Sequence, residues 1–281
     1  VCAFWFAKRN GIPLILQPHG SLKTVLGKVR LKRLYDRLFG RGILGYASRV
    51  IVLSPAEAEE ARCANIPEPK VKILHNGVPI PGPETSHLRG YFRKRFHIDD
   101  NAFVVLFIGR VRASKGVFVL LDAFDAFRKR FPHAVLAICG PDGGAARRLR
   151  KLAERRGMAL VLPGLITGED KVAAFVDSDV FCLPSPMETQ SVAFLEAASY
   201  GLPIVAAKTS APKEFVESNA GLFVSLDREA LAEAIAQLAS SVNLRKRLGS
   251  RARTVVEEDY SIDTQVSILL ELYHVVLQDT L

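Results

Sequence analysis

The chain has 281 residues, of which 49% are apolar and 24% are charged. This composition is typical of a globular protein and excludes a largely disordered chain, and the length allows one large domain or two of ordinary size. The net charge is +9, and residues 1–97 carry the whole excess, with 17 Lys or Arg against 6 Asp or Glu. This asymmetry favours an anionic partner for the first third: phospholipid headgroups, phosphorylated carriers and nucleic acid all satisfy it by charge.

The first third is predicted to be the latter half of a doubly wound α/β domain. Short apolar runs predict strands at 12–16, 50–53 and 71–74, and helical patterns predict helices at 22–39 and 55–64. The chain begins at Val1 inside the apolar segment 1–7, so we expect it to begin part way through a fold. Prolines at 79, 81 and 83 with Gly82 interrupt both ladders and helices, and we place a linker there.

From Asn101 onwards, apolar runs alternate regularly with helical patterns. Strands are predicted at 103–108, 134–139, 159–162, 180–183 and 204–207, and helices at 117–131, 145–156, 171–176 and 192–200. Continuous apolar strands between amphipathic helices specify a parallel sheet that is covered on both faces. A last helix over 261–277 carries a predicted buried stripe at Val266, Leu269, Leu270, Tyr273 and Leu277.

The four cysteines, Cys2, Cys63, Cys139 and Cys182, show no paired spacing. We interpret them as reduced core thiols of a cytosolic protein, with disulfides or zinc ligands as the alternative. No apolar stretch has the length of a membrane span, and no signal-peptide pattern opens the chain.

Ligands of open α/β sheets bind outside the carboxyl ends of the strands, so the loops that follow strands are the candidates for a site. Loop 109–116 carries Arg110 and Lys115 ahead of a helix, with Ser114 as a candidate cap, which suits a diphosphate. An ordinary solvated basic loop is the alternative.

Loop 184–191 leads into a helix in which Glu196 has almost only apolar neighbours. A carboxylate there needs hydrogen-bond donors, which sugar or ribose hydroxyls would supply; a backbone amide or a core lysine is the alternative. Glu188 lies on the preceding loop and can point into the same crevice.

Two other patterns are interpreted as structural. Gly40 to Gly45 satisfies G-x-G-x-x-G but follows a helical pattern instead of a strand, so a dinucleotide site is disfavoured. Asp177-Ser178-Asp179 resembles a metal-binding D-x-D but falls at a helix end, where a polar turn is the better interpretation.

The spacing of Glu188 and Glu196 resembles the E-x7-E signature of retaining GT-B glycosyltransferases of the "group 1" (family 4-like) class. Further segments match that family in order and spacing: 18–20, 76–78, 109–116, 139–143, 162–164, 179–185 and 195–207. The resemblance covers nearly the whole chain. It implies an α/β protein with two Rossmann-like domains facing each other: a partial acceptor-side domain over 1–82, a donor-binding domain over 83–260, and a helix over 261–281 that packs back on the first domain.

The resemblance also assigns residues. Arg110 and Lys115 would bind the donor diphosphate, Glu196 the ribose, and Glu188 the hydroxyls of the donor sugar. Backbone amides near Gln190, Ser191 and Val192 would contact sugar and phosphate. Leu165 would lie near the base and His19 beside the donor sugar, which makes His19 and Glu188 the catalytic candidates. For a single histidine in a Pro-His-Gly turn, a structural role is the alternative.

The implied reaction moves a hexose from a UDP- or GDP-linked donor to a glycan or lipid-linked acceptor, with retention and without a metal or other cofactor. The chain has Thr189-Gln190-Ser191 where members usually have Gly or an aromatic residue after the first Glu, which leaves the donor sugar open. The family's first domain begins with a strand and a Gly-rich loop that have no counterpart before Val1. On the order of a hundred residues are then expected to be missing, and turnover by this chain alone stays open.

The segment 22–41 carries seven basic residues and one acidic residue. One hypothesis is a helix on an anionic membrane surface, which would make the protein cytoplasmic and peripheral at the inner face of the membrane; a surface helix packed on its own sheet is the alternative. Nucleic acid is disfavoured as a partner because aromatic and basic residues do not interleave. A non-catalytic nucleotide-sugar-binding relative, or a partner subunit, is the alternative to the enzyme.

Overall fold

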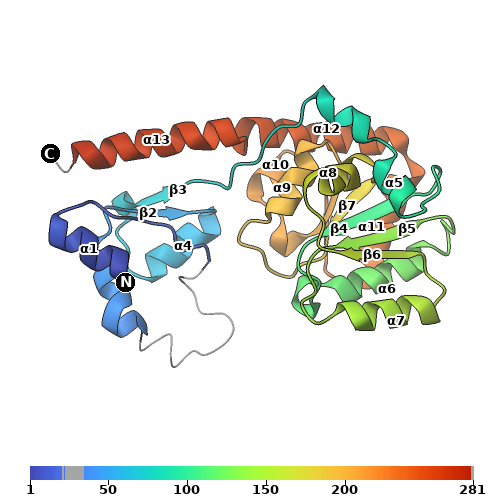
Figure 1. The fold of residues 1–281 in the computed structure, drawn as a ribbon, viewed down its shortest axis with the longest axis horizontal. Helices are drawn as coiled ribbons and strands as arrows, with labels where there is room; N and C mark the ends of the chain where they lie inside the picture. The colour runs from blue at the N-terminus through green and yellow to red at the C-terminus, as the bar shows by residue number, and fades with distance from the viewer. Residues whose placement is uncertain (21, 23–34, 280–281) are drawn as a thin grey trace. The chain divides into compact units, whose positions relative to one another are not determined.

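The computed structural model describes residues 1–20, 22 and 35–279. Its contacts divide the chain into two units, Val1–Gly77 with Ile262–Leu281, and Val78–Ser261 (Figure 1). The division falls after Gly77, whereas the sequence predicted it after residue 82. Val78 lies in the second unit because its N–H donates to the Tyr260 carbonyl at 2.9 Å. Arg253 holds Pro81 in the same unit through a hydrogen bond of 3.1 Å to its carbonyl.

The first unit is built on a three-stranded parallel sheet in the order β1-β2-β3. Its strands are β1 (Ile15–Leu16), β2 (Arg49–Val52) and β3 (Val71–Ile73), and its helical elements are α1 (Cys2–Asn10), η1 (Asp36–Gly40), α3 (Arg41–Tyr46), α4 (Pro55–Cys63), η2 (Glu68–Lys70) and α13 (Ile262–Gln278). Val50 and Val52 pack on one face of the sheet with Ala61. Ile51 faces the opposite side, as the alternation of a strand requires.

Helix α13 covers that opposite face. Leu272 and Val276 pack against Ile51 and Leu74, and Arg49 forms an ion pair with Asp279 at 2.7 Å. Of the predicted stripe, only Leu269 packs against this cluster. The rest of the stripe was wrong in register: Val266, Leu270, Tyr273 and Leu277 are all more than 40% exposed. The buried positions are Gln265, Leu272 and Val276. Apart from Gln265, the residues of both stripes are apolar, so the helical period alone does not distinguish the two stripes.

The second unit contains a six-stranded, fully parallel sheet in the order β6-β5-β4-β7-β8-β9. The strands are β4 (Val104–Ile108), β5 (Val135–Cys139), β6 (Leu160–Gly164), β7 (Val180–Leu183), β8 (Ile204–Ala207) and β9 (Leu222–Val224). Every residue of β4, β5, β7 and β8 is buried, which agrees with the continuous apolar runs of the sequence.

Helices lie on both faces of this sheet (Figure 1). They are η3 (Pro83–Leu88), α5 (Tyr91–Arg95), η4 (Ala113–Lys115), α6 (Val117–Phe127), α7 (Ala146–Arg155), α8 (Gly168–Val176), α9 (Val192–Ser199), η5 (Lys208–Ser210), α10 (Lys213–Glu217), α11 (Arg228–Ser240) and α12 (Val242–Asp259). Within the described ranges, no helix is long and apolar enough to span a membrane.

The strand order places a topological switch between β4 and β7. From β4 the chain adds β5 and β6 on one side and then crosses to β7 on the other, so the loops after β4 and β7 border a common crevice. The two loops are in close contact at Gly116, where an added Cβ would lie 1.7 Å from the Pro184 carbonyl oxygen. Gly116 has φ +72°, so both its backbone and its lack of a side chain are required there.

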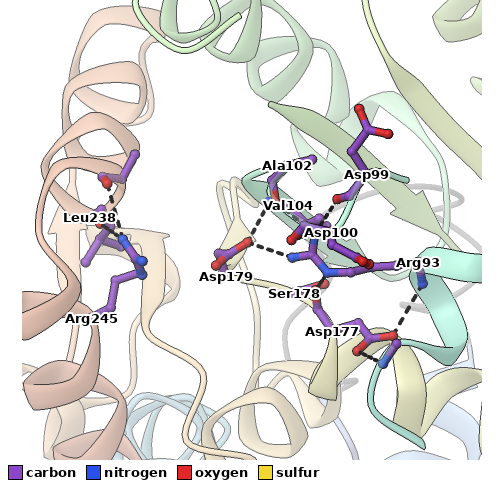
Figure 2. A network of polar contacts seen from close by, with 12 residues as sticks. Arg93, Asp99, Asp100, Ala102, Val104, Asp177, Ser178, Asp179, Leu238 and Arg245 are labelled. Atoms are coloured by element: carbon purple, nitrogen blue, oxygen red, sulfur yellow. Dashed lines mark hydrogen bonds and ion pairs between the residues drawn. The ribbon is translucent and has the colours of Figure 1, made fainter. Parts of the chain in front are cut away.

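A buried polar network fastens α5 to the start of β7 (Figure 2). Asp177, 5% exposed, accepts from the N–H groups of Gly90 (2.6 Å), Phe92 (2.8 Å) and Arg93 (3.3 Å). Asp179 accepts from the Val104 N–H at 2.8 Å and pairs with Arg93 at 3.1 Å. The Asp177 carboxylate therefore binds backbone N–H groups only, whereas that of Asp179 binds both a backbone N–H and the Arg93 guanidinium.

Several smaller expectations need correction or fall outside the described residues. Cys139 and Cys182 are buried free thiols, but Cys2 and Cys63 are exposed and do not belong to a core. Ser114 does not cap α6, because it lies within η4 and the N-cap position is Gly116. The predicted basic helix over 22–39 falls largely on residues 23–34, which lie outside the described residues.

Candidate functional site

The loop after β4 presents two cations near the crevice. Arg110 is exposed, and its Cγ lies 3.0 Å from where a Cβ on Gly143 would stand, so the loop after β5 is close by. That second loop is shaped by Asp142, which accepts from the N–H groups of Gly144 and Ala146 at 2.8 and 3.1 Å. These backbone bonds lower the pKa of the Asp142 carboxyl.

Lys115 ends the turn η4 and points to the loop after β7. Its Nζ lies 2.7 Å from Oε1 and 2.8 Å from Oε2 of Glu188. Glu188 is the more buried partner, with 11% of its side chain exposed against 31% for Lys115. The structure thus joins two predicted site residues, one from each side of the switch point.

Glu196 lies in helix α9, about one turn after the first residue of the helix. Its Oε1 accepts from Lys171 Nζ of α8 at 2.6 Å. Its Oε2 is buried and has no hydrogen-bond partner among the described residues. A core lysine, which the sequence left open as an alternative, therefore satisfies one oxygen only, and the other still requires a donor.

The remaining predicted donor residues lie around the start of α9 and the end of β6. Ser191 is the N-cap of α9, and its Oγ accepts from the Phe194 N–H at 3.3 Å. Val192, the first residue of the helix, is 43% exposed, and Gln190 is half-buried. Leu165 follows β6 with 67% of its surface exposed.

His19 belongs to the first unit and is described there by itself. It is exposed and has φ +48°, in the turn after β1. The turn is anchored by Glu57, 2% exposed, which accepts from the N–H of Gly20 and, at 2.7 Å, from the N–H of Leu53. Beside it, an apolar cavity of about 370 Å³ is lined by residues that include Leu16, Pro18, Tyr35 and Leu44.

Two functional candidates, Lys171 and Glu57, were missed from the sequence. Lys171 was taken only as the start of a predicted helix, and nothing local links it to Glu196. Glu57 had a readable signal, because Ser54 and Glu57 form the S-x-x-E spacing of a capping box. Ser54 does accept from the Glu57 N–H at 3.2 Å, but the Glu57 carboxylate turns to the His19 loop and β2 instead of its own N-cap.

Comparison with known proteins identifies relatives of both units. The family model for glycosyl transferases group 1 matches residues 90–255, and that for a glycosyl transferase 4-like domain matches residues 1–77. The chain is 26% identical to alpha-galactosylglucosyldiacylglycerol synthase of Streptococcus pneumoniae, covering 95% of this chain and 72% of that protein. It is 28% identical to D-inositol 3-phosphate glycosyltransferase of Streptomyces scabiei, covering 97% and 65%. The chain thus spans about two thirds of the length of these relatives.

Solved structures show the same fold. Anabaena Alr3699/HepE, in complex with UDP and glucose, aligns with a TM-score of 0.81 at 20% identity, over 97% of this chain and 74% of that one. Sucrose-phosphate synthase from Thermosynechococcus elongatus aligns with a TM-score of 0.77 at 21% identity, over 99% and 72%. The predicted fold class, α/β with two Rossmann-like domains of the GT-B type, is confirmed.

Proposed function

Because the chain belongs to the glycosyl transferases group 1 family, we propose that it binds a nucleotide-sugar and transfers the hexose to a glycan or lipid-linked acceptor with retention. The observation that carries this proposal is the arrangement at the switch point of the second unit. There Lys115 pairs with Glu188, and Glu196 keeps one buried oxygen unpartnered. Cations for a diphosphate and carboxylates for hydroxyls lie on neighbouring loops and on helix α9, which is what a nucleotide-sugar requires.

In this proposal Arg110 and Lys115 bind the diphosphate and stabilise the charge that develops on it as the sugar departs. Glu188 binds hydroxyls of the sugar, and Glu196 binds those of the ribose. The amides near Gln190, Ser191 and Val192 lie at the N-terminus of α9, where free N–H groups favour phosphate. Leu165 offers an apolar surface to the base. The positive charge needed at the leaving group comes from side chains, so the proposal requires no metal.

The comparisons support the choice of ligands. Anabaena Alr3699/HepE has been solved with UDP and with UDP-glucose, which favours a UDP-linked hexose. The pneumococcal relative is named as the synthase of a galactosylglucosyldiacylglycerol, which favours a lipid-bearing acceptor. The apolar cavity beside the His19 loop suits the apolar part of such an acceptor, with His19 at the reacting end. A lipid acceptor would place the protein at the inner face of the membrane, which sedimentation with anionic liposomes tests.

Calorimetric titration with UDP, GDP, UDP-glucose and GDP-mannose in the absence of metal tests the donor site, with Glu196→Ala as the control. We expect one nucleotide series to bind and the variant to lose most of that affinity. A folded chain that binds neither series would contradict the proposal. Binding without sugar transfer or donor hydrolysis, unchanged by Glu188→Ala, would favour a non-catalytic nucleotide-sugar-binding protein.

A further inference from the structure

Lys171 and Glu196 form an unequal contact. Lys171 lies in the first turns of α8, after β6, and Glu196 lies in α9, after β7. Nζ of Lys171 donates to Oε1 of Glu196 at 2.6 Å, and Oε2 receives no hydrogen bond from it. By contrast, Lys115 contacts both oxygens of Glu188. Lys171 therefore determines which oxygen of Glu196 accepts its hydrogen bond and which oxygen stays without a donor.

A purely structural ion pair does not explain this geometry. A pair with 31% and 20% of its side chains exposed gains little from Coulomb attraction alone. Leaving a carboxylate oxygen buried without a donor costs stability. Such a cost is typical of a site that is built for a ligand. The ligand group that meets the need is a hydroxyl, because it donates to the free oxygen without adding a second cation.

We propose that Lys171 is a positioning residue of the donor site: by holding Oε1 it turns Oε2 of Glu196 toward the ribose hydroxyls of a bound nucleoside diphosphate. This inference rests on the proposed donor site and adds a residue to it. Lys171 acts through Glu196 and contributes to affinity only when the ligand carries ribose hydroxyls. It therefore selects ribonucleotides over analogues that lack those hydroxyls.

The test is a double-mutant cycle between Lys171→Met and Glu196→Gln, read out by calorimetric Kd values for two probes. The probes are UDP and UDP lacking both ribose hydroxyls, or the matching guanine pair if the GDP series binds. Lys171→Arg serves as the conservative rescue. Lys151→Met, an exposed lysine of α7 with no ion pair among the described residues, is the matched control. Melting temperatures are recorded for each variant.

For Lys171→Met we expect the affinity for UDP to fall about ten-fold, because a hydrogen bond to a charged group is lost or misdirected. The affinity for the analogue should change by less than about two-fold. Lys171→Arg should recover most of the loss, and Lys151→Met should behave as wild type. The double variant should bind both probes with equal affinity. Because it buries no unpaired carboxylate, it gives this readout even if Lys171→Met alone folds poorly.

Three outcomes are distinguishable. An equal loss of affinity for both probes would mean that Lys171 contacts the diphosphate itself, and the inference would be wrong. Additive effects of the two substitutions, or no effect of Lys171→Met, would also overturn it while leaving the donor site intact. If the folded wild-type chain binds neither UDP nor GDP, the proposed donor site fails, and the inference fails with it.

Discussion

Lys115 and Glu188 bind each other through both carboxylate oxygens, at 2.7 and 2.8 Å, although we assign one to the diphosphate and the other to the sugar. The ion pair therefore competes with a diphosphate for Lys115. The same contact holds the loop after β7 against the turn η4. Binding of a complete donor has to exchange one set of charged contacts for another.

Glu188→Gln is expected to bind free nucleoside diphosphate about three- to five-fold more tightly than wild type, because an ion pair of this exposure is worth up to about 1 kcal/mol. Sugar transfer should be lost in the same variant. Calorimetry with UDP or GDP measures the first effect, with Glu154→Gln on α7 as the control. An unchanged or weaker affinity would show that the pair does not restrain Lys115.

Gly116→Ala is expected to destabilise the second unit by more than about 3 kcal/mol, because the new Cβ would overlap the Pro184 carbonyl oxygen at a positive φ. Gly144→Ala is the control, since Gly144 has φ +96° but open space around it, and should lose about 1 kcal/mol. Urea denaturation measures both. Equal losses would mean that the backbone conformation, and not the contact between the two loops, decides the cost.

Asp177→Ala should lower the free energy of unfolding by about 3 kcal/mol, because buried N–H groups of Gly90, Phe92 and Arg93 would lose their acceptor. Asp177→Asn keeps one acceptor oxygen and should lose less. Asp99→Ala, at an exposed carboxylate near the same network, is the control (Figure 2). Wild-type stability of Asp177→Ala would contradict the anchoring role.

Glu57→Ala is expected to loosen the His19 turn without unfolding the first unit. The amides of Gly20 and Leu53 would lose their acceptor, so their hydrogen exchange should become about ten-fold faster or more. Glu60→Ala on the same helix is the control. Unchanged exchange at Gly20 would mean that the turn is held by other contacts, and Glu57 would then not position His19.

Alkaline pH should destabilise the second unit. Burial raises the pKa of the Cys139 thiol from 9.0 to about 12 and also raises that of Cys182. For Tyr260, burial and then the hydrogen bond to Glu214 raise the phenol pKa. These groups stay protonated in the folded chain at pH values where the same groups of the unfolded chain have ionised. Their contribution to the free energy of unfolding is therefore complete below about pH 9 and is lost as pH rises.

The expected slope is about 1.4 kcal/mol per pH unit for each buried thiol. Urea denaturation across this range measures it. The double variant Cys139→Ala/Cys182→Ala should show a shallower decline, and Cys63→Ala, at an exposed thiol, should not. A decline of wild-type steepness in the double variant would assign the effect to other groups.

Local patterns predicted most of the second sheet because its strands are buried on both faces and read as continuous apolar runs. They failed in two places. The register of α13 was wrong because two stripes of that helix are similarly apolar. The helix α1 was not predicted, because the apolar start of the chain was assigned to no helix or strand. The two carboxylates of the candidate site were proposed from their spacing. Their partners were not, since Lys171 is 25 residues from Glu196 and meets it only because β6 and β7 end at the same edge of the sheet.

The path of the chain has a consequence for dissecting the protein. The first unit is assembled from residues up to Gly77 and from Ile262 onwards, so the second unit is an insertion whose own ends meet where Val78 bridges Ser261. One cut cannot separate the two units. A truncation that removes α13 would strip Leu272 and Val276 from the sheet of the first unit and leave the second unit whole. A gene fragment for residues 78–261 should therefore fold on its own with adjacent termini, and it should bind the donor if the proposed site is correct.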